Sequence, residues 1–228
     1  MRVVIFDIDG TLTNTKKVED KCFMTAFLQT FDVNIFNQDW ADLNHVTDWG
    51  ITEELVNIHL NREPTADEYK LMINNFILEL QSELVKDRKQ FDEVKGSNHF
   101  FNFIKTQTDW KLGIATGSWE KSALLKLNAI GLDISNIAFS NSDQFKSREE
   151  ITKNVIDQLV PSENIHEHDI IYFGDGIWDF KACQNLGINF IGIDILGDDR
   201  LKNIGAKIVF KDYLDVNQII NSINDRQG

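Results

Sequence analysis

Short apolar runs and longer amphipathic stretches alternate along most of the 228-residue chain. The apolar runs are rich in Val, Ile and Phe and are bounded by glycine or polar residues, so each predicts a buried β-strand. Strands that alternate with helical patterns indicate an α/β fold, in which a doubly wound parallel sheet carries helices on both faces. The predicted strands cover residues 3–6, 111–116, 137–140, 170–173, 190–193 and 208–210.

One long segment interrupts this alternation. Between about residues 14 and 94 the apolar positions recur at helical spacing, and no strand pattern occurs. The spacing predicts one helix from about Thr52 to Leu60. Thr65 and Glu68 form a capping-box pattern that opens another, and an apolar stripe follows them. The sequence therefore predicts a core made of residues 1–13 and 95–228, with an all-helical domain of residues 14–94 inserted after the first strand.

Composition and charge exclude several classes of protein. Hydrophobic residues make up 42% of the chain, which is enough for a folded core. The formal net charge is −13 and no block of Lys and Arg occurs, so we expect neither nucleic acid nor an anionic membrane surface as a partner. No apolar stretch approaches a membrane span, and the two cysteines lie far apart. These features predict a cytoplasmic protein, and they leave its oligomeric state open.

Two acidic residues follow the first predicted strand. Asp7 and Asp9 lie one residue apart, and Gly10 indicates a bend directly after them. Asp and Gly are common in turns, so a simple strand-ending turn is the alternative interpretation. However, two close carboxylates at the carboxyl end of a buried strand repel each other unless a proton or a cation lies between them. A hard divalent cation such as Mg²⁺ is the natural candidate.

Further polar groups follow other predicted strands. Thr116-Gly117-Ser118 follows the second strand, Lys146 lies shortly after the third, and Asp175 and Asp179 follow the fourth. Each group also has a simpler explanation when it is taken alone. Ser118 can cap the next helix, Lys146 can be a solvated surface charge, and the residues around Asp175 can form a turn. Lys126 and Lys153 are alternative candidates for the role of Lys146, but both lie inside helical patterns and do not directly follow a strand. Together these groups should meet in one crevice, because the carboxyl ends of parallel strands share one edge of the sheet.

The sequence Asp7-Ile8-Asp9-Gly10-Thr11-Leu12-Thr13 resembles the first motif of the haloacid dehalogenase superfamily. Thr116-Gly117-Ser118, Lys146, and Asp175 with Asp179 resemble its other three motifs, in the same order. The helical insertion resembles the small cap of relatives similar to phosphoglycolate phosphatase and β-phosphoglucomutase. The resemblance implies a Rossmann-like core with a helical cap and an Mg²⁺-dependent phosphatase that acts on a small phosphorylated metabolite.

The resemblance also implies a role for each motif residue. Asp7 would be the nucleophile that forms an aspartyl-phosphate, and Asp9 the general acid and base. Thr116 would bind phosphate oxygens, and Lys146 would supply a fixed positive charge. Mg²⁺ would be held by Asp7, Asp175, Asp179 and the backbone carbonyl of Asp9. The expected substrate-binding residues are Gly10, Gly117, Ser118 and three residues of a polar cap segment, His45, Thr47 and Asp48.

Several functions remain open at this level. A sugar phosphomutase would use the same core residues and return the phosphoryl group to its substrate. A dehalogenase or a phosphonate-cleaving relative would not need an acid at Asp9, so that residue argues against both. A catalytically silent binding or regulatory module is disfavoured because all four motifs are intact.

Overall fold

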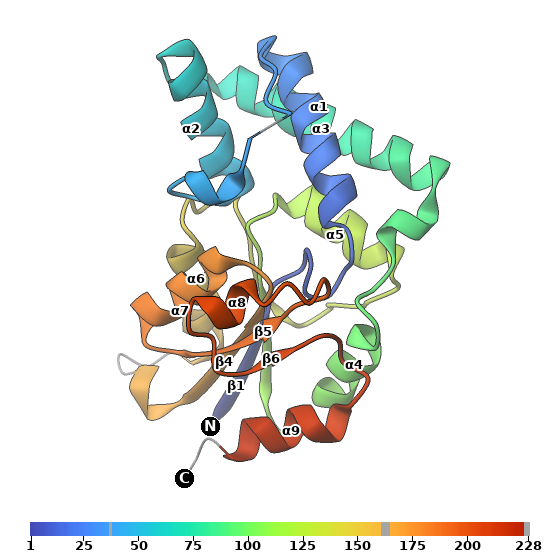
Figure 1. Ribbon diagram of the computed structural model, residues 1–228, viewed down its shortest axis with the longest axis vertical. Helices are drawn as coiled ribbons and strands as arrows, with labels where there is room; N and C mark the ends of the chain where they lie inside the picture. The colour runs from blue at the N-terminus through green and yellow to red at the C-terminus, as the bar shows by residue number, and fades with distance from the viewer. Residues whose placement is uncertain (37, 161–164, 226–228) are drawn as a thin grey trace.

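The computed structural model describes residues 1–36, 38–160 and 165–225. Figure 1 shows two parts: an α/β core that contains both termini, and a group of helices above it. The core contains a parallel sheet of six strands in the order β3-β2-β1-β4-β5-β6. The strands are β1 (Arg2–Phe6), β2 (Lys111–Ala115), β3 (Ala138–Ser140), β4 (Asp169–Gly174), β5 (Asn189–Ile193) and β6 (Val209–Phe210).

The strand order places the site. The chain begins in the middle of the sheet, builds outward through β2 and β3, and then returns to β4 on the other side of β1. The order therefore reverses between β1 and β4, where Phe6 pairs with Phe173. Ligands of open α/β sheets bind outside the carboxyl ends of the strands at such a switch point. Asp7 and Asp175 directly follow these two strands.

Helices cover both faces of the sheet because its strands are apolar on both sides. On one face Val4 and Phe6 pack with α4 (Ser97–Gln107), α5 (Glu120–Ala129) and α9 (Val216–Asn224). On the other face Val3 and Ile5 pack with α6 (Arg148–Leu159) and α7 (Ile177–Leu186). The short helix α8 (Arg200–Asn203) packs against α7. The predicted α/β fold with a doubly wound parallel sheet is confirmed.

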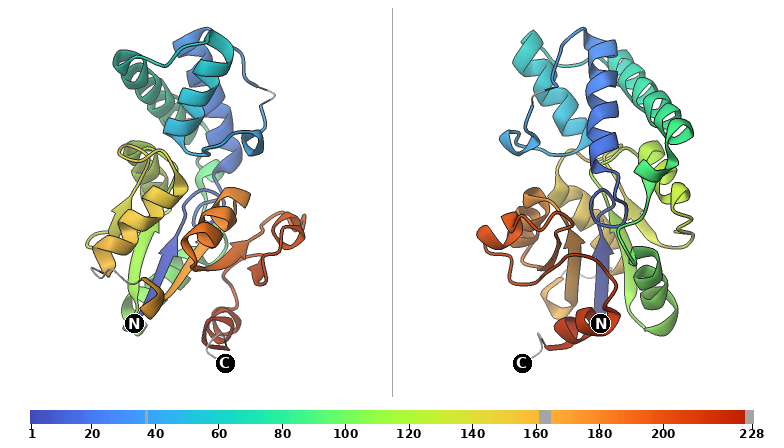
Figure 2. Two further views of the ribbon diagram at one scale, coloured as in Figure 1. Left: turned by 90° about the vertical axis from the view of Figure 1, so that its left-hand side faces the viewer. Right: turned by 45° about the vertical axis from the view of Figure 1, so that its right-hand side comes forward.

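The segment between β1 and α4 forms the cap. Its described residues contain α1 (Lys16–Phe31), α2 (Asp48–Leu60) and α3 (Ala66–Lys86), with short 3₁₀ turns at Trp40–Asp42 and Arg88–Phe91. Thr65 and Glu68 form the predicted capping box of α3. Both views in Figure 2 show these helices over one end of the core. An inserted all-helical cap is therefore confirmed, while its boundaries at residues 14 and 94 stay a prediction.

The cap and the core share one hydrophobic cluster. Trp119, at the start of α5 in the core, is 2% exposed and packs among cap residues. Its ring stacks on Phe23 of α1 at 6.1 Å and meets Phe76 of α3 edge-on at 6.0 Å. The cap therefore packs directly on α5 as well as being joined to the core by the chain.

Candidate active site at the carboxyl edge of the sheet

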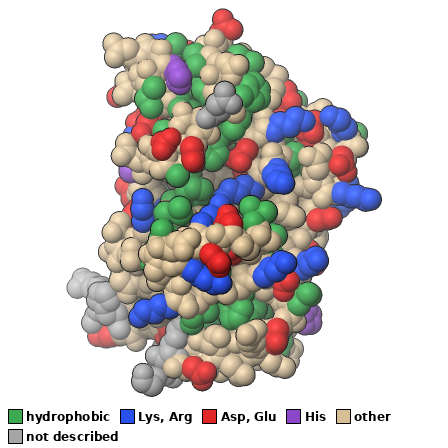
Figure 3. All heavy atoms as spheres, in the orientation of Figure 1, with side chains coloured by type: hydrophobic (Ala, Val, Ile, Leu, Met, Phe, Trp, Pro, Cys, Tyr) green, Lys and Arg blue, Asp and Glu red, His purple; other side chains and the backbone are tan. Residues whose placement is uncertain are grey.

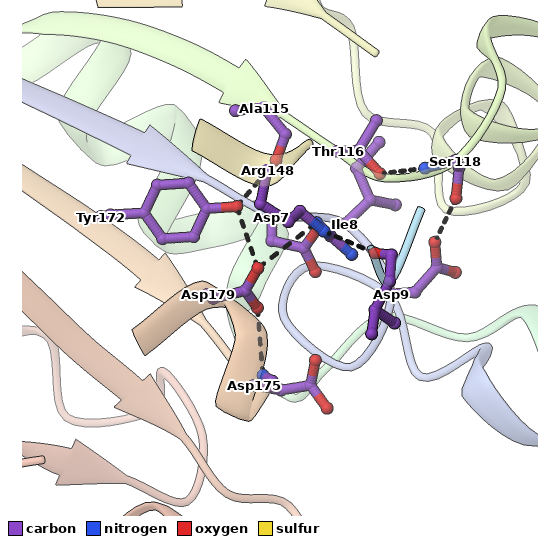
Figure 4. Close-up of polar contacts among 12 residues, drawn as sticks. Asp7, Ile8, Asp9, Ala115, Thr116, Ser118, Arg148, Tyr172, Asp175 and Asp179 are labelled. Atoms are coloured by element: carbon purple, nitrogen blue, oxygen red, sulfur yellow. Dashed lines mark hydrogen bonds and ion pairs between the residues drawn. The ribbon is translucent and has the colours of Figure 1, made fainter. Parts of the chain in front are cut away.

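Three aspartates meet at the switch point of the sheet. Asp7 follows β1, Asp175 follows β4, and Asp179 lies in the first turn of α7, and all three are buried. One carboxylate oxygen from each lies within 4.8 Å of the others. Figure 4 shows the three side chains facing one another. Three hard oxygen donors at this spacing fit a small divalent cation such as Mg²⁺.

Burial and mutual repulsion oppose full ionisation of this cluster. Burial, together with the charges of Asp179 and Asp175, raises the pKa of Asp7 to about 8 even though Arg148 opposes the shift. Burial and the charge of Asp175 likewise raise the pKa of Asp179 to about 6, against the effect of Arg148. Burial is the largest cause of both shifts, and a divalent cation at this place would favour the ionised carboxylates.

Two glycines let backbone and side chains approach closely. Gly10 has a φ of +81°, and a Cβ at this position would lie 2.5 Å from Cγ of Asp175. A Cβ on Gly117 would lie 2.7 Å from Cζ of Arg148. Gly10 is therefore required as glycine by its positive φ and by the Asp175 carboxylate, whereas a side chain at position 117 would displace the Arg148 guanidinium from its place beside Asp7.

The cation beside Asp7 is Arg148, which the sequence analysis did not identify. Its Nη1 lies 2.8 Å from Oδ1 of Asp7 and 3.3 Å from Oδ1 of Asp179, and its side chain is only 12% exposed. Lys146 was expected in this place, but its ammonium pairs with Glu53 of the cap helix α2. The difference follows from the start of α6. Ser147 is the N-cap, so Lys146 lies outside the helix and Arg148 is its first residue.

The Asp9 carboxylate points away from the three-aspartate cluster. Oδ1 accepts a hydrogen bond from Thr15 at 2.5 Å, and Oδ2 lies 2.9 Å from the Ser118 hydroxyl and 2.5 Å from the Lys126 ammonium. Burial raises the pKa of Asp9, but the charge and hydrogen bond of Lys126 outweigh it, so the pKa lies below its usual value. Its side chain is therefore not a member of the cluster, and metal binding by its backbone carbonyl stays a prediction.

The loop after β2 contributes two further predicted residues. Thr116 is 1% exposed, and its Oγ1 accepts a hydrogen bond from the Ser118 backbone N–H at 3.2 Å. The prediction that Ser118 caps the following helix is wrong. Trp119 is the N-cap of α5, and the Ser118 hydroxyl contacts Asp9 and Glu19 instead. Because the link between β2 and α5 is short, the Ser118 side chain points toward the site.

The polar cap segment lies against the core. The Asp48 N–H donates to the Gly117 carbonyl at 2.7 Å, and the Trp119 N–H donates to the Asp48 carboxylate at 2.8 Å. The Thr47 hydroxyl donates to the Lys146 carbonyl at 2.8 Å. Thr47 is also the N-cap of α2, so this helix begins at Asp48, earlier than the pattern predicted. The cap is therefore closed over the site.

A small cavity of about 60 Å³ lies between the cap and the core. Of the three predicted cap residues, Thr47 and Asp48 line it. His45 lines a second cavity of about 320 Å³, and Arg148 and Trp178 line both cavities. Aromatic side chains form much of the cap wall of the small cavity. They belong to Phe23 and Trp40, and Trp178 of the core helix α7 faces the same cavity.

Positive charge gathers near the site although the protein is acidic. Figure 3 shows Lys and Arg side chains around the junction of cap and core. Lys16 and Arg200 pair with the Asp175 carboxylate at 2.9 and 3.0 Å, respectively. Together with Arg148 and Lys126 they offset part of the charge of the buried acids, so an anionic group can approach this part of the surface.

Comparison with known proteins agrees with this geometry. Residues 4–193 match the family model described as haloacid dehalogenase-like hydrolase. The chain belongs to this family. Among the described residues of this family member, no helix is both long and apolar enough to cross a membrane. No match was found among curated proteins.

Solved structures support the family fold. A hydrolase from Pseudomonas syringae matches with a TM-score of 0.76 and 20% identity, covering 98% of this chain and 99% of that one. A β-phosphoglucomutase from Clostridium difficile matches with a TM-score of 0.71 and 16% identity, covering 99% of this chain and 98% of that one. A predicted phosphoglycolate phosphatase from Haemophilus somnus matches with a TM-score of 0.64 and 16% identity, covering 96% of this chain and 98% of that one. At these identities the likeness shows the shared fold with its cap.

Proposed function

We propose that this family member is an Mg²⁺-dependent phosphatase that hydrolyses a small phosphate monoester through an aspartyl-phosphate on Asp7. The observation that supports it most is the cluster of Asp7, Asp175 and Asp179 beside the Arg148 guanidinium, beneath a closed cap. Phosphoryl transfer needs a nucleophile, a cation site and a phosphate-binding group in one place. Structural likeness to a phosphatase and a phosphomutase adds support.

Asp7 would start the reaction. One carboxylate oxygen forms a bond to phosphorus while the bond between phosphorus and the leaving oxygen breaks. Because the pKa of Asp9 lies below its usual value, its carboxylate first takes up a proton from water and then gives this proton to the leaving oxygen. Asp9 then takes a proton from the water that attacks the phosphoenzyme, which releases phosphate and regenerates both carboxyl groups. Mg²⁺, held by Asp7, Asp175, Asp179 and the Asp9 carbonyl, would reduce the repulsion between the nucleophile and the anionic phosphate.

The remaining residues would bind and neutralise the phosphoryl group. Arg148 supplies positive charge beside the nucleophile, where the transferred oxygens carry negative charge in the transition state. The Thr116 hydroxyl and the N–H group of Gly117 are the proposed phosphate ligands, with Ser118 next to them. Their hydrogen bonds hold the group for attack and take the place of bulk water. The Gly10 N–H donates to the Thr13 carbonyl at 2.7 Å, so Gly10 would contribute through its close backbone approach to the site.

The closed cavity limits the leaving group. The cavity between the cap and the core has a volume of about 60 Å³, which favours a small phosphate ester. Thr47 and Asp48, which line this cavity, are the proposed contacts to the leaving group, and His45 would meet a substrate only through the neighbouring cavity. Specificity would therefore depend mainly on the cap.

A sugar phosphomutase is the second candidate, supported by the likeness to β-phosphoglucomutase at a TM-score of 0.71. The core residues would be the same, but the phosphoryl group would return to another hydroxyl of the sugar. Phosphorus NMR of sugar-phosphate reactions separates the two candidates, because a mutase gives an isomeric sugar phosphate and a phosphatase gives inorganic phosphate.

The proposal is tested with the purified full chain, Mg²⁺ and 4-nitrophenyl phosphate, followed by a panel of sugar phosphates, phosphoglycolate and nucleotides. We expect release of phosphate that excess chelator stops and the Asp7→Asn variant does not show. An exposed matched change, Asp67→Asn on α3, should leave the rate unaltered. Absence of turnover with every ester would contradict the proposal and support a silent binding module.

A further inference from the structure

Lys126 lies where a helix normally presents an apolar residue to the core. It belongs to the buried face of α5, together with Ala123 and Leu127, and its side chain is 0% exposed. Burying an ammonium group is costly unless each of its donors finds an acceptor. A lysine at such a position therefore needs a specific set of partners.

The Lys126 ammonium has three acceptors for its three N–H groups. They are Oδ2 of Asp9 at 2.5 Å, Oγ of Ser118 at 2.9 Å, and Oε1 of Glu19. The acceptors come from three separate segments: the loop after β1, the loop after β2, and the cap helix α1. Lys126 thus joins both catalytic loops of the core to the cap through one buried charge.

These contacts determine where the Asp9 carboxylate lies. Thr15 donates to one of its oxygens, while Lys126 and Ser118 contact the other, so both oxygens are held. Burial and the charge of Asp9 raise the pKa of Glu19 well above its usual value, so Asp9 carries the negative charge that Lys126 neutralises. Without the ammonium group, Oδ2 of Asp9 would keep the Ser118 hydroxyl as its donor but lose its cation. A buried carboxylate with no cation beside it would move from its present position.

We propose that Lys126 is a positioning residue that orients the Asp9 carboxyl group for proton transfer and, through Glu19, ties this orientation to closure of the cap. The inference rests on the proposed function, in which Asp9 exchanges a proton with the leaving oxygen and with water. Lys126 itself does not meet the phosphoryl group, and its effect passes through Asp9.

A leaving-group comparison tests this role. An alkoxide needs a proton as it departs, whereas 4-nitrophenolate departs without one, so misplacing Asp9 should slow alkyl phosphates selectively. We expect Lys126→Met to lower kcat for an alkyl phosphate by about 10²-fold, the lower end of general acid catalysis. Formation of the phosphoenzyme from 4-nitrophenyl phosphate should fall less than about tenfold, because it bypasses that proton transfer.

Two further variants make the test specific. Lys121→Met makes the same chemical change on the exposed side of α5 and should leave both substrates unaffected. Lys126→Arg keeps the positive charge and should recover at least part of the alkyl phosphate rate relative to Lys126→Met. If Lys126→Met does not fold, Lys126→Arg is compared directly with the native chain and should show the same selective loss, smaller in size.

The outcomes distinguish the inference from the proposed function. If the native chain turns over neither ester, the proposed function fails. If the native chain is active and Lys126→Met loses phosphoenzyme formation and alkyl phosphate turnover equally, after correction for the folded fraction, the lysine is only structural and the inference is overturned. A selective loss for alkyl phosphates, recovered by arginine, supports it.

Discussion

Replacing Arg148 tests which cation serves the nucleophile. The Arg148 side chain is 12% exposed and lies 2.8 Å from the Asp7 carboxylate and 3.3 Å from that of Asp179. Lys146, which the sequence favoured, is 37% exposed and pairs with Glu53, itself 28% exposed. The two cations therefore differ in burial and in partner, and removing each should have a different consequence.

The expected magnitudes follow from these environments. Loss of one fixed group that stabilises transition-state charge in a buried site costs about 2.7–4 kcal/mol, or about 10²–10³-fold in rate. We expect this loss in kcat/KM for Arg148→Met. A partly exposed ion pair is worth only about 0.2–1 kcal/mol, so Lys146→Met should reduce the rate by no more than about fivefold.

The assay is initial-rate kinetics with 4-nitrophenyl phosphate at saturating Mg²⁺. Saturating metal offsets the negative charge of Asp7 and Asp179 in the variant that lacks Arg148. Circular dichroism gives the folded fraction that is used to correct each rate. The reasoning would be refuted if Lys146→Met lost about 10²-fold or more while Arg148→Met lost less than about tenfold. Lys146 would then reach the phosphoryl group in the working enzyme, as the sequence motif predicts.

Three further predictions concern the metal and the cap. Activity should disappear in excess chelator and return with Mg²⁺ but not with Ca²⁺, because the looser coordination of Ca²⁺ misplaces the Asp7 nucleophile; full turnover in chelator would contradict the cation site. Mg²⁺ affinity measured by calorimetry should rise with pH up to about 8. The pKa of Asp179 is raised to about 6 and that of Asp7 to about 8, so both carboxyl groups must lose a proton before metal binds. An affinity that does not change with pH would contradict this. A cleavable thiol cross-linker that joins Glu53→Cys to Lys146→Cys, whose native side chains meet across cap and core, should abolish multiple turnover until the linker is cleaved; unchanged turnover in the cross-linked protein would show that the cap does not gate the reaction.

The sequence was sufficient to predict the fold and the meeting of the acids. Buried strands are short, apolar and bounded by glycine, so their number and order could be read from the chain. Once the strands are known to be parallel, residues that follow them must meet at one edge. Asp7, Asp175 and Asp179 are brought together for this reason, although they are far apart in the chain.

The sequence could not predict contacts that depend on how helices pack. Lys126 has helical neighbours on both sides, so nothing local separates a buried lysine from a solvated one. Only the approach of Glu19 on the cap helix and of Asp9 on the core loop distinguishes it. The helical periodicity places Lys126 at an apolar position of α5, but this alone does not distinguish a buried ammonium group from one that reaches solvent.

Helix starts decided two other differences. Lys146 and Arg148 lie two residues apart, and which one faces Asp7 depends on Ser147 being the N-cap. The capping box of Ser147 and Glu150 was recognisable in the sequence and places Arg148 at the first helical position. The start of α2 was missed because Thr47 and Asp48 lie in a polar stretch, where a single capping threonine is hard to distinguish from a loop residue.

Trapping the phosphoenzyme tests the central claim most directly. Asp9→Asn keeps the nucleophile but removes the group that activates water, a loss of about 10²–10⁴-fold in proton transfer. After rapid quench from 4-nitrophenyl phosphate and Mg²⁺, intact mass spectrometry should show Asp9→Asn with one added phosphoryl group, mapped to Asp7 by peptide analysis. Asp7→Asn should show none. A phosphoryl group on Asp7→Asn, or turnover of alkyl phosphates by Asp9→Asn at the native rate, would contradict the assignment of nucleophile and acid–base group.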